Sequence, residues 1–125
     1  MMKIEITADL NIVPYCRPRI NSMTKAVYNP EKYTAFKNQL AMIAKAQMQG
    51  KPPIKGAFKL SADFFKVSSA NILNKKFGDT DNFVKSVLDA LTGICYVDDA
   101  QCVELGTIRK FKSKNPKIII TIEEG

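Results

Sequence analysis

The most informative segment of the chain is GDTDNFVKSVLDALTG, residues 78–93. With a helical repeat of about 100° per residue, its apolar side chains fall on one face, between about 200° and 340° from Asp81. Asp81, Lys85 and Asp89 form a separate polar stripe at about 0°, 40° and 80°. Residues 79–91 are therefore predicted to form an amphipathic helix whose apolar face packs against the rest of the domain.

Alternating apolar and polar residues predict strands on both sides of this helix. The predicted strands lie within residues 2–13, 57–67, 102–112 and 117–123, and a short apolar strand is expected at 94–97. Residues 30–49 are rich in helix formers and stop at a glycine, so they form the other predicted helix. The order β-α-β-α-β-β predicts an α+β fold of one domain, residues 1–125, with a mixed sheet and helices packed on it.

Two details of this scheme bear on the site and the core. Residues 14–29 contain two prolines and several basic residues without periodicity, so they are predicted to be a loop. A loop of that length inside a compact domain is usually functional or disordered. In the helix after it, Met42 and Met48 are expected to fill the core.

The composition excludes several kinds of active site. The 125 residues include no histidine, which rules out a Ser-His-Asp triad, a Cys-His dyad and His-ligated zinc. Cys16, Cys95 and Cys102 have no zinc-binding spacing, and we expect reduced, mostly buried thiols in a cytoplasmic protein. We find no signal-peptide pattern at the N-terminus, and no apolar run approaches the ~18 residues of a membrane span.

The net charge of +7 is unevenly distributed. Residues 1–60 carry ten Lys or Arg and three Asp or Glu, whereas residues 61–125 carry nine of each kind. Excess positive charge favours polyanionic partners through counterion release, so nucleic acid is the first partner to consider. Solvated lysines on exposed faces would give the same charge, and charge alone leaves both interpretations open.

Five aspartates of the neutral half fall within 21 residues, at positions 79, 81, 89, 98 and 99. Asp79 and Asp81 share the first turn of the predicted helix without a basic residue between them, so their charges repel unless a cation intervenes. The loops decide whether Asp99 returns to that turn. If it does, three carboxylates converge, and oxygen ligands without histidine suit Mg²⁺ or Mn²⁺.

Such a site could hydrolyse a phosphodiester, with Lys85 offsetting charge on the phosphate. A purely structural interpretation competes with it. Asp79 would cap the helix, and Asp81, Lys85 and Asp89 would form surface ion pairs worth a few tenths of a kcal/mol.

The acidic motifs resemble those of a known family. The pattern D-x-D-N-x-x-K-x-x-x-D-A-L at residues 79–91, followed by D-D-x-Q at residues 98–101, is similar to the RusA family of Holliday junction resolvases. The basic Arg17-Pro18-Arg19 and the Tyr28-Asn29-Pro30 segment also resemble that family's N-terminal loop. The resemblance covers nearly the whole chain in order and length.

The resemblance implies a homodimeric, Mg²⁺-dependent endodeoxyribonuclease that makes symmetric paired nicks across four-way junctions in DNA recombination and repair, with Mn²⁺ as a substitute ion. By position, Asp79, Asp81 and Asp99 are expected to bind the metal, and together with Lys85 they are the expected catalytic residues. Asp98 is expected to serve either in this site or in the turn, and Asp89 to have a structural role such as pairing with Lys85.

The expected DNA contacts are basic residues in two loops, namely Arg17, Arg19, Lys25, Lys75 and Lys76. Some members of the family carry a basic residue directly before the first aspartate, where this chain has Gly78, and Lys75 and Lys76 could supply that charge. Two alternatives remain open at this point. The chain could be a broader nuclease of branched or flap DNA, or a DNA-binding module without catalytic activity.

Overall fold

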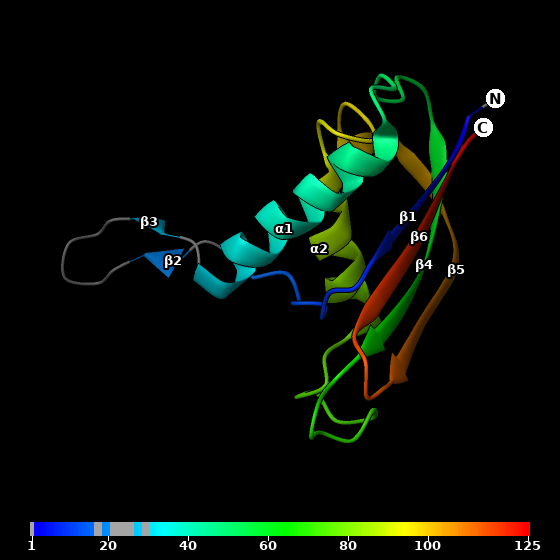
Figure 1. Cartoon of the computed structure of the whole chain (residues 1–125). Coiled ribbons are helices and arrows are strands. Elements are labelled where there is room, and N and C mark those ends of the chain that lie inside the picture. The colour runs from blue at the N-terminus through cyan, green and yellow to red at the C-terminus, as the bar shows by residue number, and fades with distance from the viewer. Residues whose placement is uncertain (1, 17–18, 21–26, 29–30) are drawn as a thin grey trace.

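The computed structural model describes residues 2–16, 19–20, 27–28 and 31–125, and its centre is a four-stranded sheet (Figure 1). The strands are β1 (Lys3–Ala8), β4 (Phe58–Lys66), β5 (Cys102–Lys112) and β6 (Lys117–Glu124), in the spatial order β1-β6-β4-β5. β6 pairs antiparallel with β1 and β4, whereas β4 and β5 run parallel. The sheet is mixed, as predicted.

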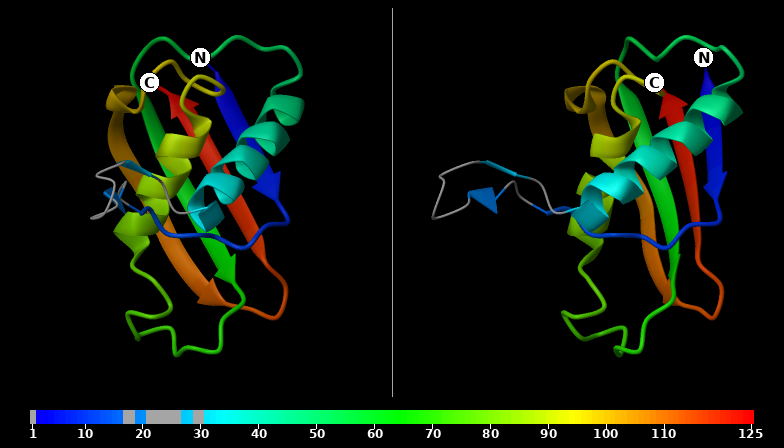
Figure 2. Two further views of the ribbon diagram at one scale, coloured as in Figure 1. Left: turned by 90° about the vertical axis from the view of Figure 1, so that its left-hand side faces the viewer. Right: turned by 60° about the vertical axis from the view of Figure 1, so that its left-hand side comes forward.

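Both long helices cover the same face of this sheet (Figure 2). α1 (Glu31–Met48) packs toward β1, and α2 (Thr80–Leu91) lies beside α1 and reaches β5. Neither helix has the length and apolar character that crossing a membrane requires, among the residues described. The α+β architecture with helices packed on one sheet agrees with the prediction.

The core lies between the helices and the sheet and is built from the predicted periodicities. Ile118, Ile120 and Ile122 alternate inward along β6, and all three are buried. On α2, four residues of the expected apolar face, Phe83, Val84, Val87 and Leu91, are buried, and the fifth, Leu88, is half-buried. One continuous cluster of buried residues joins the sheet to both helices, so the start of α2 is held on a rigid base.

Three local predictions were wrong. Met42 is 72% exposed because the buried positions of α1 are 33, 36, 40, 44 and 48, and Met42 points away from that stripe, whereas Met48 is buried as expected. Of the cysteines, which are all free thiols, Cys95 is buried but Cys16 and Cys102 are half-buried. The first strand ends at Ala8, since Asn11 instead exchanges two hydrogen bonds with the backbone of Val67.

Two short segments also differ from the prediction. Residues 94–97 form a turn rather than a strand, in which Tyr96 makes isolated bridges to Ile54 and Thr92. Their apolar character serves the core, because the side chains of Cys95 and Tyr96 are fully buried there. Within the predicted loop 14–29, the pair β2 (Arg19–Ile20) and β3 (Val27–Tyr28) forms a two-stranded antiparallel ribbon away from the main sheet.

Candidate active site

Asp79 and Asp81 lie at the start of α2, and both are exposed. Asp79 occupies the N-cap position with extended backbone, φ −92° and ψ 141°, yet its side chain makes no capping hydrogen bond. Its backbone carbonyl instead accepts the first helical hydrogen bond, from the amide of Phe83. The Asp79 carboxylate is therefore free of the capping role that the structural interpretation gave it.

The backbone directly before Asp79 is held from two strands. The Lys66 ammonium on β4 donates to the carbonyl of Phe77, and the Lys110 ammonium on β5 donates to the carbonyl of Gly78 at 2.9 Å. Burial, aided by Lys32 and Lys110, lowers the pKa of Lys66. Two cations thus fix the turn that leads into the acidic pair, and the alternating strand pattern gave no sign of this role.

Gly78 is required by this turn. Its φ of +113° is a conformation that favours glycine, and a Cβ atom there would lie 2.4 Å from the ring of Phe83. The basic residue that some family members carry at this position would therefore be sterically excluded in this chain. Lys75 and Lys76 are exposed in the preceding turn, so they can supply positive charge near the start of α2.

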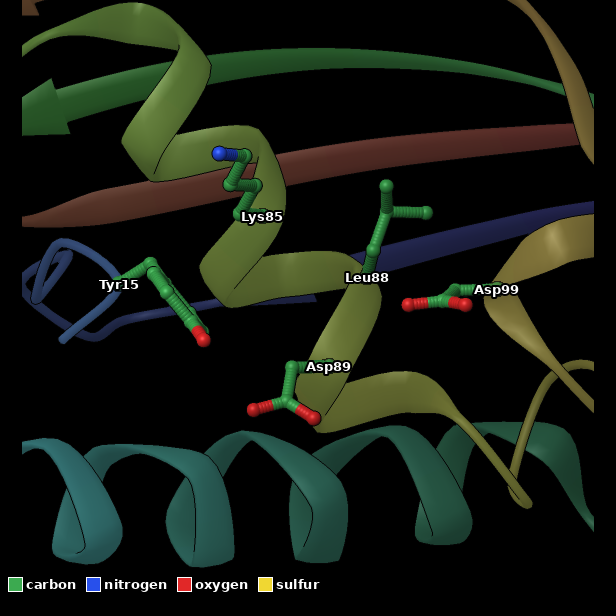
Figure 3. Close-up of a pocket in the computed structure, with 5 residues that line it drawn as sticks. All are labelled: Tyr15, Lys85, Leu88, Asp89 and Asp99. Carbon is green, nitrogen blue, oxygen red and sulfur yellow. The ribbon is translucent and has the colours of Figure 1, made fainter. Parts of the chain in front are cut away.

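A pocket of about 450 Å³ lies further along α2 (Figure 3). It is lined by Tyr15, Lys85, Leu88, Asp89 and Asp99. The Lys85 ammonium lies 5.9 Å from the centre of the Tyr15 ring, and Lys85 forms no salt bridge with the part of the chain that the structure describes. Its charge is therefore available to an anionic ligand.

The Asp89 carboxylate contacts side chains of α1 rather than Lys85. The Tyr33 hydroxyl donates to its carboxylate at 2.7 Å, and the Lys37 ammonium lies 3.1 Å from the same oxygen. Burial and this carboxylate raise the pKa of Tyr33. The expected structural role of Asp89 holds, but the expected partner Lys85 was wrong, because α1 supplies both partners.

The turn Asp98–Gln101 is organised by its glutamine. The amide of Asp98 donates to the Gln101 side-chain oxygen at 2.7 Å, and the Gln101 amide group donates to the carbonyls of Ile54 and Gly56, each at 2.8 Å. This turn precedes β5 as a short 3₁₀ helix, Asp99–Gln101. Burial and the neighbouring Asp98 raise the pKa of Asp99. Gln101 thus anchors the turn that carries Asp99.

A single chain does not bring the three expected metal-binding aspartates together. Asp99 lies beside Leu88, which is seven residues after Asp81 and so about 10 Å further along the helix axis. Among the described residues, no three His, Cys, Asp or Glu side chains form a group that could hold a metal ion. The chain turns back directly after α2 at Gly93, which leaves Asp99 near the far end of the helix.

Most of the expected DNA contacts fall in the N-terminal loop. Arg17 and Lys25 lie outside the described residues, and Arg19 is described only through its backbone in β2. The segment that carries Lys75 and Lys76, residues 68–78, lies at the end of the molecule where α2 begins (Figure 1). The structure thus leaves the predicted contacts of the loop untested and keeps the two described lysines exposed.

Comparison with known proteins agrees with the motifs. The family described as endodeoxyribonuclease RusA matches residues 9–123, nearly the whole chain and every residue of the predicted catalytic set. The chain belongs to the RusA family. A relative in this comparison is the uncharacterized protein YqaN of Bacillus subtilis, which is 29% identical over 125 residues, covering 86% of this chain and 87% of the relative. RusA proteins are endodeoxyribonucleases, so DNA is the substrate class that membership implies.

Proposed function

We propose that this RusA protein is a Mg²⁺-dependent endodeoxyribonuclease that resolves Holliday junctions by symmetric paired nicks, in DNA recombination and repair. The family match that runs through both acidic motifs carries the proposal. Two observations support it: the Asp79 side chain makes no capping hydrogen bond, and neither Asp79 nor Asp81 forms a salt bridge among the described residues. We place the activity in the cytoplasm, where the free thiols would remain reduced.

Asp79, Asp81 and Asp99 would hold the ion, because hard carboxylate oxygens suit Mg²⁺, with Mn²⁺ as a substitute. The ion would supply Lewis acidity toward the scissile phosphate and lower the pKa of the attacking water. Lys85 would stabilise the negative charge that develops on the phosphate oxygens. It is available for this role because it forms no salt bridge among the described residues.

The separation of Asp99 from the acidic pair favours a homodimeric site. A two-fold axis that sets the α2 helices of two copies antiparallel would bring the end of one helix to the start of the other. Asp99 of one copy would then meet Asp79 and Asp81 of the second. Two such sites related by symmetry would match the two strands that are nicked in a four-way junction.

Basic residues would hold the DNA arms. Lys75 and Lys76 belong to the segment that leads directly into Asp79 and the start of α2, and Arg17, Arg19 and Lys25 would add charge in the N-terminal loop. Arg side chains suit bidentate phosphate binding. Replacing one of these basic residues by alanine should flatten the salt dependence of DNA binding, because fewer counterions are then released.

The test is cleavage of synthetic four-way, three-way and flap substrates with and without Mg²⁺, comparing wild type with Asp81→Asn. Wild type is expected to nick the four-way junction in symmetric pairs, and Asp81→Asn is expected to bind without nicking. Equal cutting of all three substrates would replace junction specificity with a broader nuclease of branched DNA. Binding without any nicking by wild type would leave a DNA-binding module.

A further inference from the structure

β5 is the longest strand of the sheet and lies at its edge. It has 11 residues and, within the described chain, pairs only with β4, so one side of its backbone offers unpaired N–H and C=O groups. Residues 103–107 are all exposed, and Val103 and Leu105 keep 72% and 53% of their surface open. A long exposed edge with apolar side chains is a template for pairing with another strand.

The charges along β5 favour an antiparallel partner of the same sequence. Asp98, Asp99 and Glu104 lie before or early in the strand, and Arg109, Lys110 and Lys112 lie near its end. A second copy laid parallel would set like charges against each other. A second copy laid antiparallel would set the acidic start of one strand beside the basic end of the other.

An irregularity in β5 allows residues that face each other across a two-fold axis to project from the same side of the sheet. Leu105 lies opposite Leu60 of β4 and Ile108 opposite Ala62, so β5 carries one extra residue between these pairs. Leu105 and Ile108 therefore share the helix-facing side of the sheet. Glu104 and Arg109, which lie opposite Lys59 and Asp63, share the other side.

We propose that two copies of this chain pair antiparallel along β5, with a two-fold axis between Gly106 and Thr107 that joins the two sheets into one. Glu104 of each copy then lies across from Arg109 of the other, and Leu105 lies across from Ile108. Arg109 holds Asp63 through Nε and Nη2, which leaves Nη1 for the facing glutamate. The inference rests on the homodimer of the proposed function and names its interface.

This pairing also gives a reason for the separated carboxylates. Val103 of one copy would lie across from Lys110 of the other, and Lys110 donates to the carbonyl of Gly78, one residue before Asp79. The segment that carries Asp99 immediately precedes β5. The start of each β5 would thus bring its Asp99 toward the acidic pair of the second copy.

The first test is the mass of the full chain in solution by light scattering, without DNA or metal. Wild type is expected to have twice the chain mass of 14.0 kDa. Leu105→Lys places an ammonium group on the seam and is expected to weaken dimerisation at least 10-fold. Met42→Lys is the matched control, because Met42 is also an exposed apolar residue but lies on α1, and this variant is expected to remain a dimer.

A disulfide tests the register without relying on a destabilised variant. In a background of Cys16→Ala and Cys102→Ala, Thr107→Cys is expected to form a covalent dimer on mild oxidation, because Thr107 of both copies would lie next to the axis. Met42→Cys in the same background is expected to stay uncross-linked. Circular dichroism on every variant shows that the chain is folded.

The outcomes separate this inference from the proposed nuclease activity. A monomeric wild type, or a Leu105→Lys variant that stays dimeric with no cross-link at Thr107→Cys, overturns the β5 interface even if junctions are nicked. A dimer that dissociates with Leu105→Lys and cross-links at Thr107→Cys supports the interface even if no substrate is nicked. In that last case the interface stands and the proposed function fails.

Discussion

The two acidic motifs of this chain are used differently by the fold. At the start of α2, Asp79 takes the N-cap position without using its carboxylate, and two lysines hold the backbone in front of it. At the turn before β5, Gln101 makes three hydrogen bonds that fix the backbone. The first motif thus leaves the Asp79 carboxylate without a capping role, whereas in the second motif a single glutamine organises the turn that carries Asp99.

The largest effect is expected from exchanging single carboxylates in the two motifs. Asp79→Asn removes a proposed metal ligand and should lower Mg²⁺-dependent junction nicking at least about 100-fold, since a metal supplies several kcal/mol of charge stabilisation. Asp98→Asn leaves its backbone amide bonded to Gln101 and should keep nicking within about 5-fold of wild type. Single-turnover cleavage measures both, and equal losses would erase the distinction between the motifs.

Gly78→Ala should damage the start of α2 through sterics alone. The new methyl group meets the Phe83 ring at a positive φ, so we expect a loss of about 2–4 kcal/mol in the free energy of unfolding. Gly93→Ala is the control, because its φ of +84° is also positive but no atom lies within 4 Å of the added Cβ. Its loss should stay near ~1 kcal/mol, as measured by urea denaturation. Equal losses would mean that the ring contact does not matter.

Gln101→Ala should loosen the second motif. The variant removes three hydrogen bonds: it leaves the Gly56 carbonyl and the Asp98 amide without their partner, and it leaves the Ile54 carbonyl with the Val97 amide as its remaining donor. This should cost about 1–3 kcal/mol of unfolding free energy. Gln39→Ala, at an exposed position of α1, should change it by less than about 0.5 kcal/mol. Urea denaturation again gives the numbers, and an unchanged Gln101→Ala would remove the anchoring role.

The smallest effect concerns the pH dependence of stability at Asp99. Its pKa is raised above the ordinary 3.8 by burial and by Asp98, so the folded state keeps the proton longer than the unfolded state. The free-energy cost of ionising Asp99 in the folded state therefore appears as the pH rises from the ordinary pKa through the raised pKa of the folded state. Asp99→Asn in EDTA should therefore be more stable than wild type at pH 7, by less than about 1 kcal/mol, and equal to it below pH ~3.8. A gain that is the same at both pH values would assign the effect to packing.

The fold was largely predictable because its signals are local. The apolar stripe of α2 and the alternation in β6 set which faces are buried, and both periodicities are visible in short windows of sequence. The prediction that Met42 is buried was wrong because α1 is apolar on more than one side, and only the packing partner determines which side is buried. The β2–β3 ribbon was not predicted because each of its strands has only two residues, which are too few for a periodicity to appear.

The sequence predicts candidate residues for the site but not how the fold arranges them. The spacing of Asp79, Asp81 and Lys85 on one helix places them without further information. The position of Asp99 depends on the turn at Gly93 and on bridges between Tyr96 and Ile54, which are contacts across the chain. Lys66 and Lys110 were missed for the same reason, since their bonds reach carbonyls 11 and 32 residues away.

Subunit mixing is the decisive test of whether the acidic pair of one copy and Asp99 of another form one metal site. Asp81→Asn and Asp99→Asn are each expected to be inactive as homodimers on a four-way junction with Mg²⁺. After the two variants are unfolded and refolded together, each mixed dimer would contain one intact site and one doubly altered site. We predict that single-strand nicking of the junction reappears in the mixture. A mixture that forms dimers of both chains and stays inactive would mean that the metal site is not shared between copies.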